Sequence, residues 1–573
     1  MGEMMVLERA RKWLGEAYDE ATRNEVQELI DENGSALTDA FYKDLEFGTG
    51  GLRGVMGAGT NRINIYTIGM ATQGLSNYLN EVYGKNPIQV VVAHDSRNNS
   101  RLFAETTAAV FSANGIQVFL FEDLRPTPEL SFTLRELKAQ AGVVVTASHN
   151  PKEYNGYKVY WSDGGQLVPP HDKRTIEEVR KITGPEMVNF KAKPSHIHTI
   201  GQEMDEKYWN RITELGLNNA GKDRIKIVYT PIHGTGFNGV PQVLNKMGFT
   251  QVEVLRSQAH PDGNFPTVQS PNPEEAAALN LAIERANEID ADLVLGTDPD
   301  SDRVGIAVRH SNGEMILMNG NETACILVHY ILSQYRQKGW LKGNEFVAKT
   351  IVTTDLITEI AASFGVRVYE CLTGFKYIAD LIRSKEGREK YLVGGEESYG
   401  YLVGDFVRDK DAVSSAAMIC EAAAWAKSQG MSLLDYLEKI HREFDVYEEV
   451  LISLTKKGKS GAEEIKQMMQ DFRNNPIQSI NGYPVIITRD YLSGYERDLR
   501  NGEDRPLGLP TSNVFQFILQ DRTIITARPS GTEPKIKFYI SARDKVMRDD
   551  TYEVDRVKLQ EKIIGVKYAL GLE

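Results

Sequence analysis

Three aspartates with alternating spacing are the residues of this sequence best suited to bind a metal ion. Asp298, Asp300 and Asp302 follow an apolar run in LVLGTDPDSDR. In an extended loop, residues i, i+2 and i+4 point the same way, and Pro299 opposes a helix here. Clustered carboxylates repel unless a cation neutralises them, and hard oxygen ligands favour Mg²⁺ over zinc or copper. The spacing therefore predicts a magnesium site with Arg303 beside it as a phosphate partner, and a solvated acidic turn is the alternative.

A serine at the end of another apolar run is the candidate nucleophile. Ser148 lies in VVVTASHNP, and the GxSxG pattern of one class of serine hydrolases is absent there. A serine oxygen near magnesium is well placed to carry a phosphoryl group. We therefore predict that Ser148 carries phosphate and also contacts the metal, with His149 and Lys158 as candidates for proton transfer. An ordinary polar turn is the alternative.

A polar turn near the C-terminus has the composition of an anion-binding loop. Arginine binds phosphate with two parallel hydrogen bonds, hydroxyls donate, and glycine lets backbone N–H groups approach an anion. Serine, glycine and proline are also ordinary turn residues, so a plain turn is the alternative. In RPSGTEPK the candidates for phosphate binding are Arg528, Ser530, Gly531, Thr532 and Lys535.

Two further loops offer contacts to a sugar phosphate. Glu396 and Ser398, in GGEESYG, could accept and donate hydrogen bonds to sugar hydroxyls, although this segment alone is typical of a surface turn. Arg53 lies in FGTGGLRGVMGAG, which we predict to be a glycine-rich loop that allows close approach of a ligand. Thr373 and Lys376, in CLTGFKY, are additional candidates for substrate binding.

The elements that would position these loops form a loose internal repeat. Each unit has an apolar strand, a polar loop, an amphipathic helix, a glycine and a second strand, and the glycines are Gly115, Gly248 and Gly365. Glycine suits the left-handed conformation just past a helix. A further strand then ends at Ser148, Asp298 or Glu396. Because ligands bind beyond the carboxyl ends of strands in α/β sheets, the three loops are expected to face one cleft.

We therefore expect an α/β protein with three similar mixed α/β domains and a C-terminal α+β domain around a central cleft. From about Val446 the pattern changes to short strands and a terminal helix, and the segment from about Lys173 to Met204 is polar and is expected to be irregular. The predicted domains are 1–205 with the serine loop, 206–322 with the metal loop, 323–445 with the sugar loop and 446–573 with the phosphate loop.

Composition limits the class of protein. The chain has 573 residues, too many for a single core. Its net charge of −13 argues against a general nucleic-acid binder. Its three cysteines favour a reducing compartment, and no apolar run suits a signal peptide or membrane span. These features predict a cytoplasmic protein that binds small molecules and neither nucleic acid nor membrane.

Four motifs in order resemble the α-D-phosphohexomutase superfamily, which includes phosphoglucomutases and phosphomannomutases. TASHNP is similar to its phosphoserine loop, DPDSDR to its metal loop, GEES to its sugar loop and RPSGTEPK to its phosphate loop. The resemblance implies a phosphorylated Ser148, Mg²⁺ at the three aspartates, and Arg53 as an active-site arginine. FGTGGLRG resembles the branch with phosphopentomutases and some bacterial phosphoglucomutases. Some bacterial members carry histidine where this chain has Gly400, which leaves the second acid/base unassigned.

The resemblance implies a phosphoglucomutase that interconverts glucose 1-phosphate and glucose 6-phosphate through a phosphoserine and glucose 1,6-bisphosphate, which would also act as activator. A monomer or weak homodimer is expected. Phosphomannomutase, phosphopentomutase and sugar-bisphosphate synthase activities remain open. An aspartyl-nucleophile sugar phosphatase and a non-enzymatic sugar-phosphate-binding protein are alternatives from other classes.

Overall fold

The computed structural model describes residues 3–48, 50–456, 458–530, 535–545 and 552–572. The chain divides into two compact units. The first contains Met1–Gly320 and Phe375–Ser432, and the second contains Asn321–Gly374 and Leu433–Glu573.

Three N-terminal helices form a small cluster of their own in the first unit. Buried Trp13 and Phe41 pack at its centre with Tyr66, and the side chain of Asp19 caps the second helix by accepting from the N–H of Thr22. The helices are α1 (Glu3–Lys12), α2 (Glu20–Glu32) and α3 (Ser35–Phe41).

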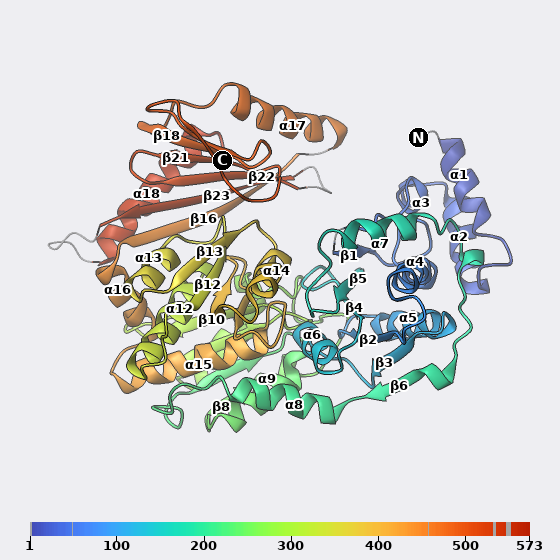
Figure 1. The fold of residues 1–573 in the computed structure, drawn as a ribbon, viewed down its shortest axis with the longest axis horizontal. Helices are drawn as coiled ribbons and strands as arrows, with labels where there is room; N and C mark the ends of the chain where they lie inside the picture. The colour runs from blue at the N-terminus through green and yellow to red at the C-terminus, as the bar shows by residue number, and fades with distance from the viewer. Residues whose placement is uncertain (1–2, 49, 457, 531–534, 546–551, 573) are drawn as a thin grey trace. The chain divides into compact units, whose positions relative to one another are not determined.

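The first sheet has six strands in the order β1-β5-β4-β2-β3-β6. Strands β2, β3, β4 and β6 run parallel, β5 pairs antiparallel with β4, and β1 pairs antiparallel with β5 at the edge. The strands are β1 (Gly51–Val55), β2 (Gln89–His94), β3 (Gln117–Phe121), β4 (Ala141–Val145), β5 (Tyr154–Trp161) and β6 (Ile197–Ile200). Helices α4 (Ile65–Tyr83), α5 (Ser100–Ala113), α6 (Thr127–Glu136) and α7 (His171–Arg180) belong to this part of the chain, blue to teal in Figure 1.

The second sheet has the order β11-β10-β9-β7-β8, in which β7, β8 and β9 are parallel and β10 pairs antiparallel with both β9 and β11. Its strands are β7 (Ile227–Thr230), β8 (Val252–Val254), β9 (Leu293–Thr297), β10 (Val304–Arg309) and β11 (Met315–Met318). Its helices are α8 (Gln202–Thr213), α9 (Gly236–Lys246), α10 (Arg256–Ala259) and α11 (Ala276–Glu288).

The first unit also contains two antiparallel strands and two helices from farther along the chain. These are β14 (Lys390–Gly395), β15 (Tyr401–Val403), α14 (Phe375–Lys385) and α15 (Ala412–Ser428). Helix α15 is almost entirely buried, and the side chain of Asp411 caps its N-terminus.

The second unit begins with a parallel strand pair and its helices, namely β12 (Glu345–Thr350), β13 (Arg367–Cys371), α12 (Gly320–Gln337), α13 (Leu356–Ser363) and α16 (Leu433–Glu443). An antiparallel sheet follows, ordered β16-β23-β22-β21-β18-β19-β20 with β17 beside β18. Its strands are β16 (Val446–Thr455), β17 (Ser479–Ile480), β18 (Tyr483–Asp490), β19 (Tyr495–Asp498), β20 (Asp504–Pro506), β21 (Phe515–Leu519), β22 (Ile524–Pro529) and β23 (Lys535–Asp544). Helices α17 (Gly458–Asn474) and α18 (Tyr552–Ala569) share one apolar core with this sheet.

The local predictions for the repeat are confirmed. Gly115, Gly248 and Gly365 each lie two residues past a helix, with φ of 81°, 92° and 72°. Ser148, Asp298 and Glu396 each follow a strand end closely, and the C-terminal region is an antiparallel sheet with helices. No helix within the described ranges has the length and apolar character needed to cross a bilayer.

The prediction of an irregular segment from Lys173 to Met204 is wrong at both ends of the segment, while residues 181–196 form no α-helix or strand. Helix α7 starts at His171, and β6 pairs in parallel with β3. Strand β6 lies at the sheet edge with two exposed polar side chains, His198 and Thr199. Its pairing depends on the neighbouring backbone, which an apolar pattern does not reveal.

Candidate active site

The loop between β9 and β10 brings three buried carboxylates together. Asp298 Oδ1 accepts the N–H groups of Asp302 and Arg303 at 3.0 Å each, and Ser301 has φ of 53°. Asp298, Asp300 and Asp302 each offer one oxygen, and these oxygens lie within 4.8 Å of one another. The predicted cluster is thus present. It is formed by a tight turn and not by the extended loop we expected.

This cluster fits a divalent cation. Asp300 Oδ1 and Asp302 Oδ1 are buried, and neither has a hydrogen-bond partner among the described residues. Buried carboxylate oxygens without donors are costly, and a hard cation satisfies them. The donor set consists only of oxygen atoms, which suits magnesium better than zinc or copper.

Ser148 lies directly against the first of these carboxylates. Its Oγ donates to Asp298 Oδ2 at 2.8 Å and lies 3.2 Å from His149 Nδ1. Burial and the charges of Asp300 and Asp302 hold the pKa of Asp298 well above its ordinary value. The serine loop and the metal loop, which lie 150 residues apart in the sequence, are therefore in direct contact.

Lys158, on β5, contributes positive charge to the cluster. Its Nζ lies 2.7 Å from Asp300 Oδ2 and 3.0 Å from Asp302 Oδ2. Burial opposes the charge of Lys158, but the two aspartates outweigh burial and raise its pKa. Lys158 is therefore protonated, and any phosphoryl group beside the aspartates would lie close to a fixed cation.

A second buried lysine, Lys410, was missed by sequence reasoning. Its Nζ lies 3.2 Å from Asp302 Oδ2 and 3.1 Å from Asp409 Oδ1, and Asp409 Oδ2 accepts from Tyr160 at 2.7 Å and Gln166 at 3.0 Å. Burial opposes its charge, but Asp302 and Asp409 raise its pKa. The run Arg408–Asp411 alternates in charge like a solvated surface, and only its position just after β15 could have suggested a site.

The N-terminus of α6 positions the metal loop, which the sequence also did not indicate. Thr127 donates its N–H to the carbonyl of Asp300 at 2.9 Å and its hydroxyl to Asp300 Oδ2 at 2.8 Å. On the other side, the N–H of Thr235 donates to the carbonyl of Pro299 at 2.8 Å. These bonds orient Asp300 so that Oδ2 is satisfied and Oδ1 is left for a cation.

The predicted sugar loop lies beside the metal loop. Arg303 Nη1 donates to the carbonyl of Ser398 at 3.2 Å and also pairs with Glu274. Glu396 is buried. Burial lowers the pKa of Lys410, Asp302 and Asp409 raise it, and the charge of Glu396 raises it further by a smaller amount. A side chain at Gly400 would meet Lys410 Cδ at 2.1 Å, so the lysine fills the space beside this glycine.

Arg53 lies in β1, where we predicted a glycine-rich loop. Its register partner is Gly156 on β5, which accepts this close backbone approach because a Cβ there would lie 2.8 Å from the carbonyl oxygen of Leu52. Arg53 Nη1 donates to Asn150 Oδ1 at 3.1 Å, next to the serine loop. The prediction of a loop is wrong because strand pairing overrides the flexibility of glycine, but Arg53 does lie near Ser148.

The predicted phosphate-binding residues belong to the second unit. Arg528 is the penultimate residue of β22 and lies opposite Lys537, and the N–H of Ser530 donates to the carbonyl of Lys535 at 2.7 Å. Gly531 and Thr532 lie outside the described residues. Of the two additional candidates, Thr373 lies in the second unit and Lys376 in the first, on α14. Their roles in binding stay predictions.

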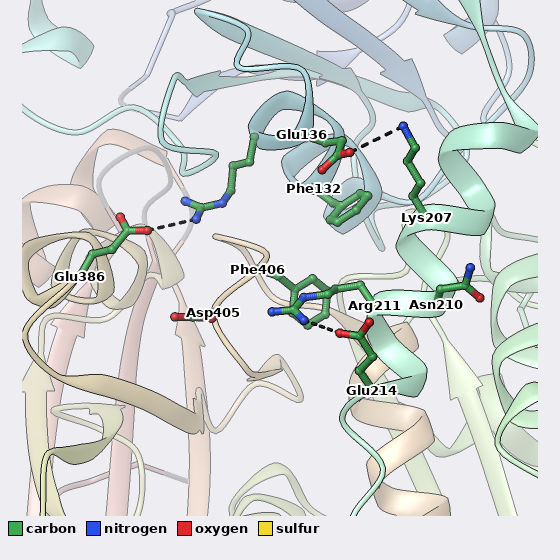
Figure 2. A pocket seen from close by; sticks show the side chains of 10 residues that line it. Phe132, Glu136, Lys207, Asn210, Arg211, Glu214, Glu386, Asp405 and Phe406 are labelled. Carbon is green, nitrogen blue, oxygen red and sulfur yellow. Dashed lines mark hydrogen bonds and ion pairs between the residues drawn. The ribbon is translucent and has the colours of Figure 1, made fainter.

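A separate cavity of about 590 Å³ lies between the C-terminal half of α6, α8 and the loop after β15 (Figure 2). Phe132 and Phe406 lie on its wall with ring centroids 6.3 Å apart. Six of its charged side chains form ion pairs with one another, shown dashed in Figure 2: Arg135 with Glu386, Lys207 with Glu136, and Arg211 with Glu214. Its lining includes neither Ser148 nor the three aspartates, so the candidate site lies elsewhere.

Comparison with known protein families gives three consecutive matches. The alpha/beta/alpha domains I, II and III of the phosphoglucomutase/phosphomannomutase family match residues 44–185, 206–313 and 319–444. Together these matches cover more than half of the chain.

Curated relatives and solved structures point to the same family as these three matches. A phosphoglucomutase of Staphylococcus epidermidis is 38% identical over 91% of this chain and 94% of its own, and one of Staphylococcus aureus is 36% identical over 95% and 97%. The fold is similar to that of the parafusin phosphoprotein (phosphoglucomutase) of Paramecium, with a TM-score of 0.68 at 16% identity over 93% of this chain and 96% of that one. It is also similar to that of a phosphomannomutase-like protein of Thermus thermophilus, with a TM-score of 0.64 at 20% identity over 91% and 99%. The chain therefore belongs to the phosphoglucomutase/phosphomannomutase family and is a phosphohexomutase, an isomerase that acts on sugar phosphates.

Proposed function

We propose that this enzyme is a phosphoglucomutase that interconverts glucose 1-phosphate and glucose 6-phosphate through phosphorylated Ser148. The observation that carries the proposal is the 2.8 Å contact of Ser148 Oγ with Asp298 Oδ2, inside a buried carboxylate cluster flanked by Lys158 and Lys410. The relatives named phosphoglucomutase favour glucose over mannose or a pentose.

In the proposed reaction the phosphoryl group of Ser148 passes to the 6-hydroxyl of glucose 1-phosphate. The bond from phosphorus to Ser148 Oγ breaks, and a bond to the sugar oxygen forms. The resulting glucose 1,6-bisphosphate turns round within the site. Its 1-phosphoryl group then returns to Ser148, and glucose 6-phosphate leaves. Added glucose 1,6-bisphosphate would activate the enzyme because it can phosphorylate Ser148.

We propose Mg²⁺ as the cation held by Asp298, Asp300 and Asp302 together with the oxygen of Ser148. When bound, it would offset negative charge on the transferring phosphoryl group. Lys158 would offset the same charge, and its position is fixed by its ion pairs with Asp300 and Asp302.

His149 is the group best placed for a proton transfer at Ser148, because its Nδ1 lies 3.2 Å from Ser148 Oγ. Burial and the nearby charges of Arg303 and Arg53 hold the pKa of His149 well below its ordinary value, so its ring is neutral and a weak base. Lys410 fills the space beside Gly400, where some family members carry histidine, and its raised pKa makes it a fixed positive charge and not a ready proton donor. The second acid/base is left unassigned.

A substrate panel tests the proposed activity. Purified enzyme is assayed with the 1-phosphates of glucose, mannose and ribose, with and without glucose 1,6-bisphosphate. We expect kcat/KM for glucose 1-phosphate to exceed the others by about tenfold or more, a difference of about 1.4 kcal/mol. We also expect the bisphosphate to raise the rate. A higher kcat/KM for mannose or ribose phosphate would reassign the substrate.

The proposed phosphate loop predicts an effect on KM. Arg528→Ala is expected to raise KM for glucose 1-phosphate about 10- to 100-fold, because one charge-assisted contact to the phosphate that is not transferring is lost. Steady-state kinetics measure this change. Lys545→Ala is the matched control, because this exposed lysine follows the opposite end of β23. An unchanged KM in Arg528→Ala would place the phosphate-binding residues elsewhere.

A further inference from the structure

Arg97 lies in the loop after β2, and its buried side chain binds the backbone of the serine loop. Nη2 donates to the carbonyl of Ser148 at 2.6 Å and also to that of Asn150. Nη1 donates to the carbonyls of Pro151 at 2.8 Å and Tyr154 at 3.0 Å. One guanidinium thus binds four carbonyls that begin at the candidate nucleophile. The fixed, planar arrangement of its donors suits this, and a lysine ammonium could not reproduce it.

Asp95 extends the network to the other side of the serine. Its Oδ2 lies 3.3 Å from Arg97 Nε and accepts from the Thr146 hydroxyl at 2.7 Å. Thr146 Oγ1 in turn accepts the N–H of Ser148 at 2.8 Å. The side chains of Arg97 and Asp95 have no exposed area, so water does not compete for these bonds. Both the N–H and the carbonyl of Ser148 are therefore held by one connected network.

The network holds Ser148 in an unfavourable backbone conformation. Ser148 has φ of 53°, a left-handed backbone that is unfavourable for a residue with a side chain. Such a residue keeps this conformation only where its surroundings hold it. The same conformation accompanies the contact of Ser148 Oγ with Asp298, so the backbone bonds determine where the nucleophile points.

We propose that Arg97, oriented by Asp95, is a positioning residue that aims Ser148 at the metal loop; this inference rests on the proposed role of Ser148 as phosphoryl carrier. Nη1 and Nη2 of Arg97 donate to backbone carbonyls, and the guanidinium forms a buried ion pair with Asp95, so its function is to hold the loop and not to bind substrate phosphate. The ring of Phe265, 5.1 Å from the guanidinium carbon, packs against Arg97 and keeps it in place.

The test compares Arg97→Lys, Thr146→Val and Thr146→Ser with wild type. For Arg97→Lys we expect kcat to fall about 100-fold, the cost of a slightly misplaced reacting group, with KM unchanged within about twofold. Thr146→Val should lower kcat about tenfold, and Thr146→Ser should restore it, because only the hydroxyl binds the Ser148 N–H. Phosphoenzyme made with glucose 1,6-bisphosphate should also lose its phosphate to water faster in Arg97→Lys and Thr146→Val.

Controls and outcomes separate positioning from general stability. Arg101→Lys is the matched control on the exposed face of α5, where Arg101 pairs only with Glu105 among the described residues, and it should match wild type. If Arg97→Lys does not fold, the comparison of Thr146→Val with Thr146→Ser still tests the inference. Wild-type kcat and phosphoenzyme lifetime in Arg97→Lys or Thr146→Val, or a change confined to KM, overturns the inference. If Ser148→Ala is inactive while these variants are normal, only this inference fails; if Ser148→Ala is active, the proposed function fails.

Discussion

Replacement of Ser148 by alanine is expected to lower turnover of glucose 1-phosphate by on the order of 10⁴-fold or more, because the variant has no oxygen to carry the phosphoryl group. The fold should persist. Alanine is no less suited than serine to the left-handed backbone at this position, and the hydroxyl takes with it only its hydrogen bonds to Asp298 and His149. The measurements are coupled formation of glucose 6-phosphate and the thermal unfolding midpoint.

The phosphorylation state gives this prediction a second readout. Intact-mass and fragment analysis of wild type treated with glucose 1,6-bisphosphate should find one phosphoryl group, on Ser148, and none in the variant. Ser270→Ala is the matched control, since its hydroxyl lies near the carbonyl of His149 at 3.5 Å but touches no carboxylate of the metal loop in the described contacts. Substantial turnover by Ser148→Ala would reject the carrier, and phosphate on Asp298 would favour an aspartyl-nucleophile phosphatase.

Asp300→Asn is expected to lower turnover about 10³-fold and to weaken Mg²⁺ binding by at least about tenfold. The buried Oδ1 of Asp300 has no hydrogen-bond donor among the described residues and is the oxygen best placed to bind a cation. Asparagine keeps the shape but replaces one oxygen with a donor that a hard cation does not bind. Turnover as a function of Mg²⁺ concentration and calorimetric titration of the enzyme with Mg²⁺ measure the two effects.

Removal of the metal and a control variant test the predicted role of Asp300 further. Removal of divalent cations with EDTA should abolish wild-type turnover, and Mg²⁺ should restore it. Asp290→Asn is the matched control, because Asp290 is an exposed residue close in sequence to β9 and asparagine tolerates its left-handed φ of 54°. A metal requirement and a calorimetric affinity equal to wild type in Asp300→Asn would exclude Asp300 from the metal site.

Where sequence reasoning failed, the error has an identifiable cause. Glycines around Arg53 suggested a loop, but β5 pairs with this segment and makes it a strand. The polar stretch after Lys173 suggested irregular structure, but β3 supplies a partner for β6. In both cases a strand formed because another strand lay beside it, and pairing partners are not encoded within the paired segment alone. The predicted domain limits and the central cleft stay predictions.

The sequence by itself determined the local chemistry: which loops follow strand ends, where glycines end the helices, and that three aspartates cluster after β9. These features depend on residues a few positions apart, so spacing and backbone preference are sufficient. Only the tertiary structure showed that Thr127 bonds to Asp300 across 173 residues, that Lys410 joins Asp302, and that Arg97 holds the loop of Ser148. Such contacts follow from the order of strands in the sheets and from the packing of helices on them, which no local pattern specifies.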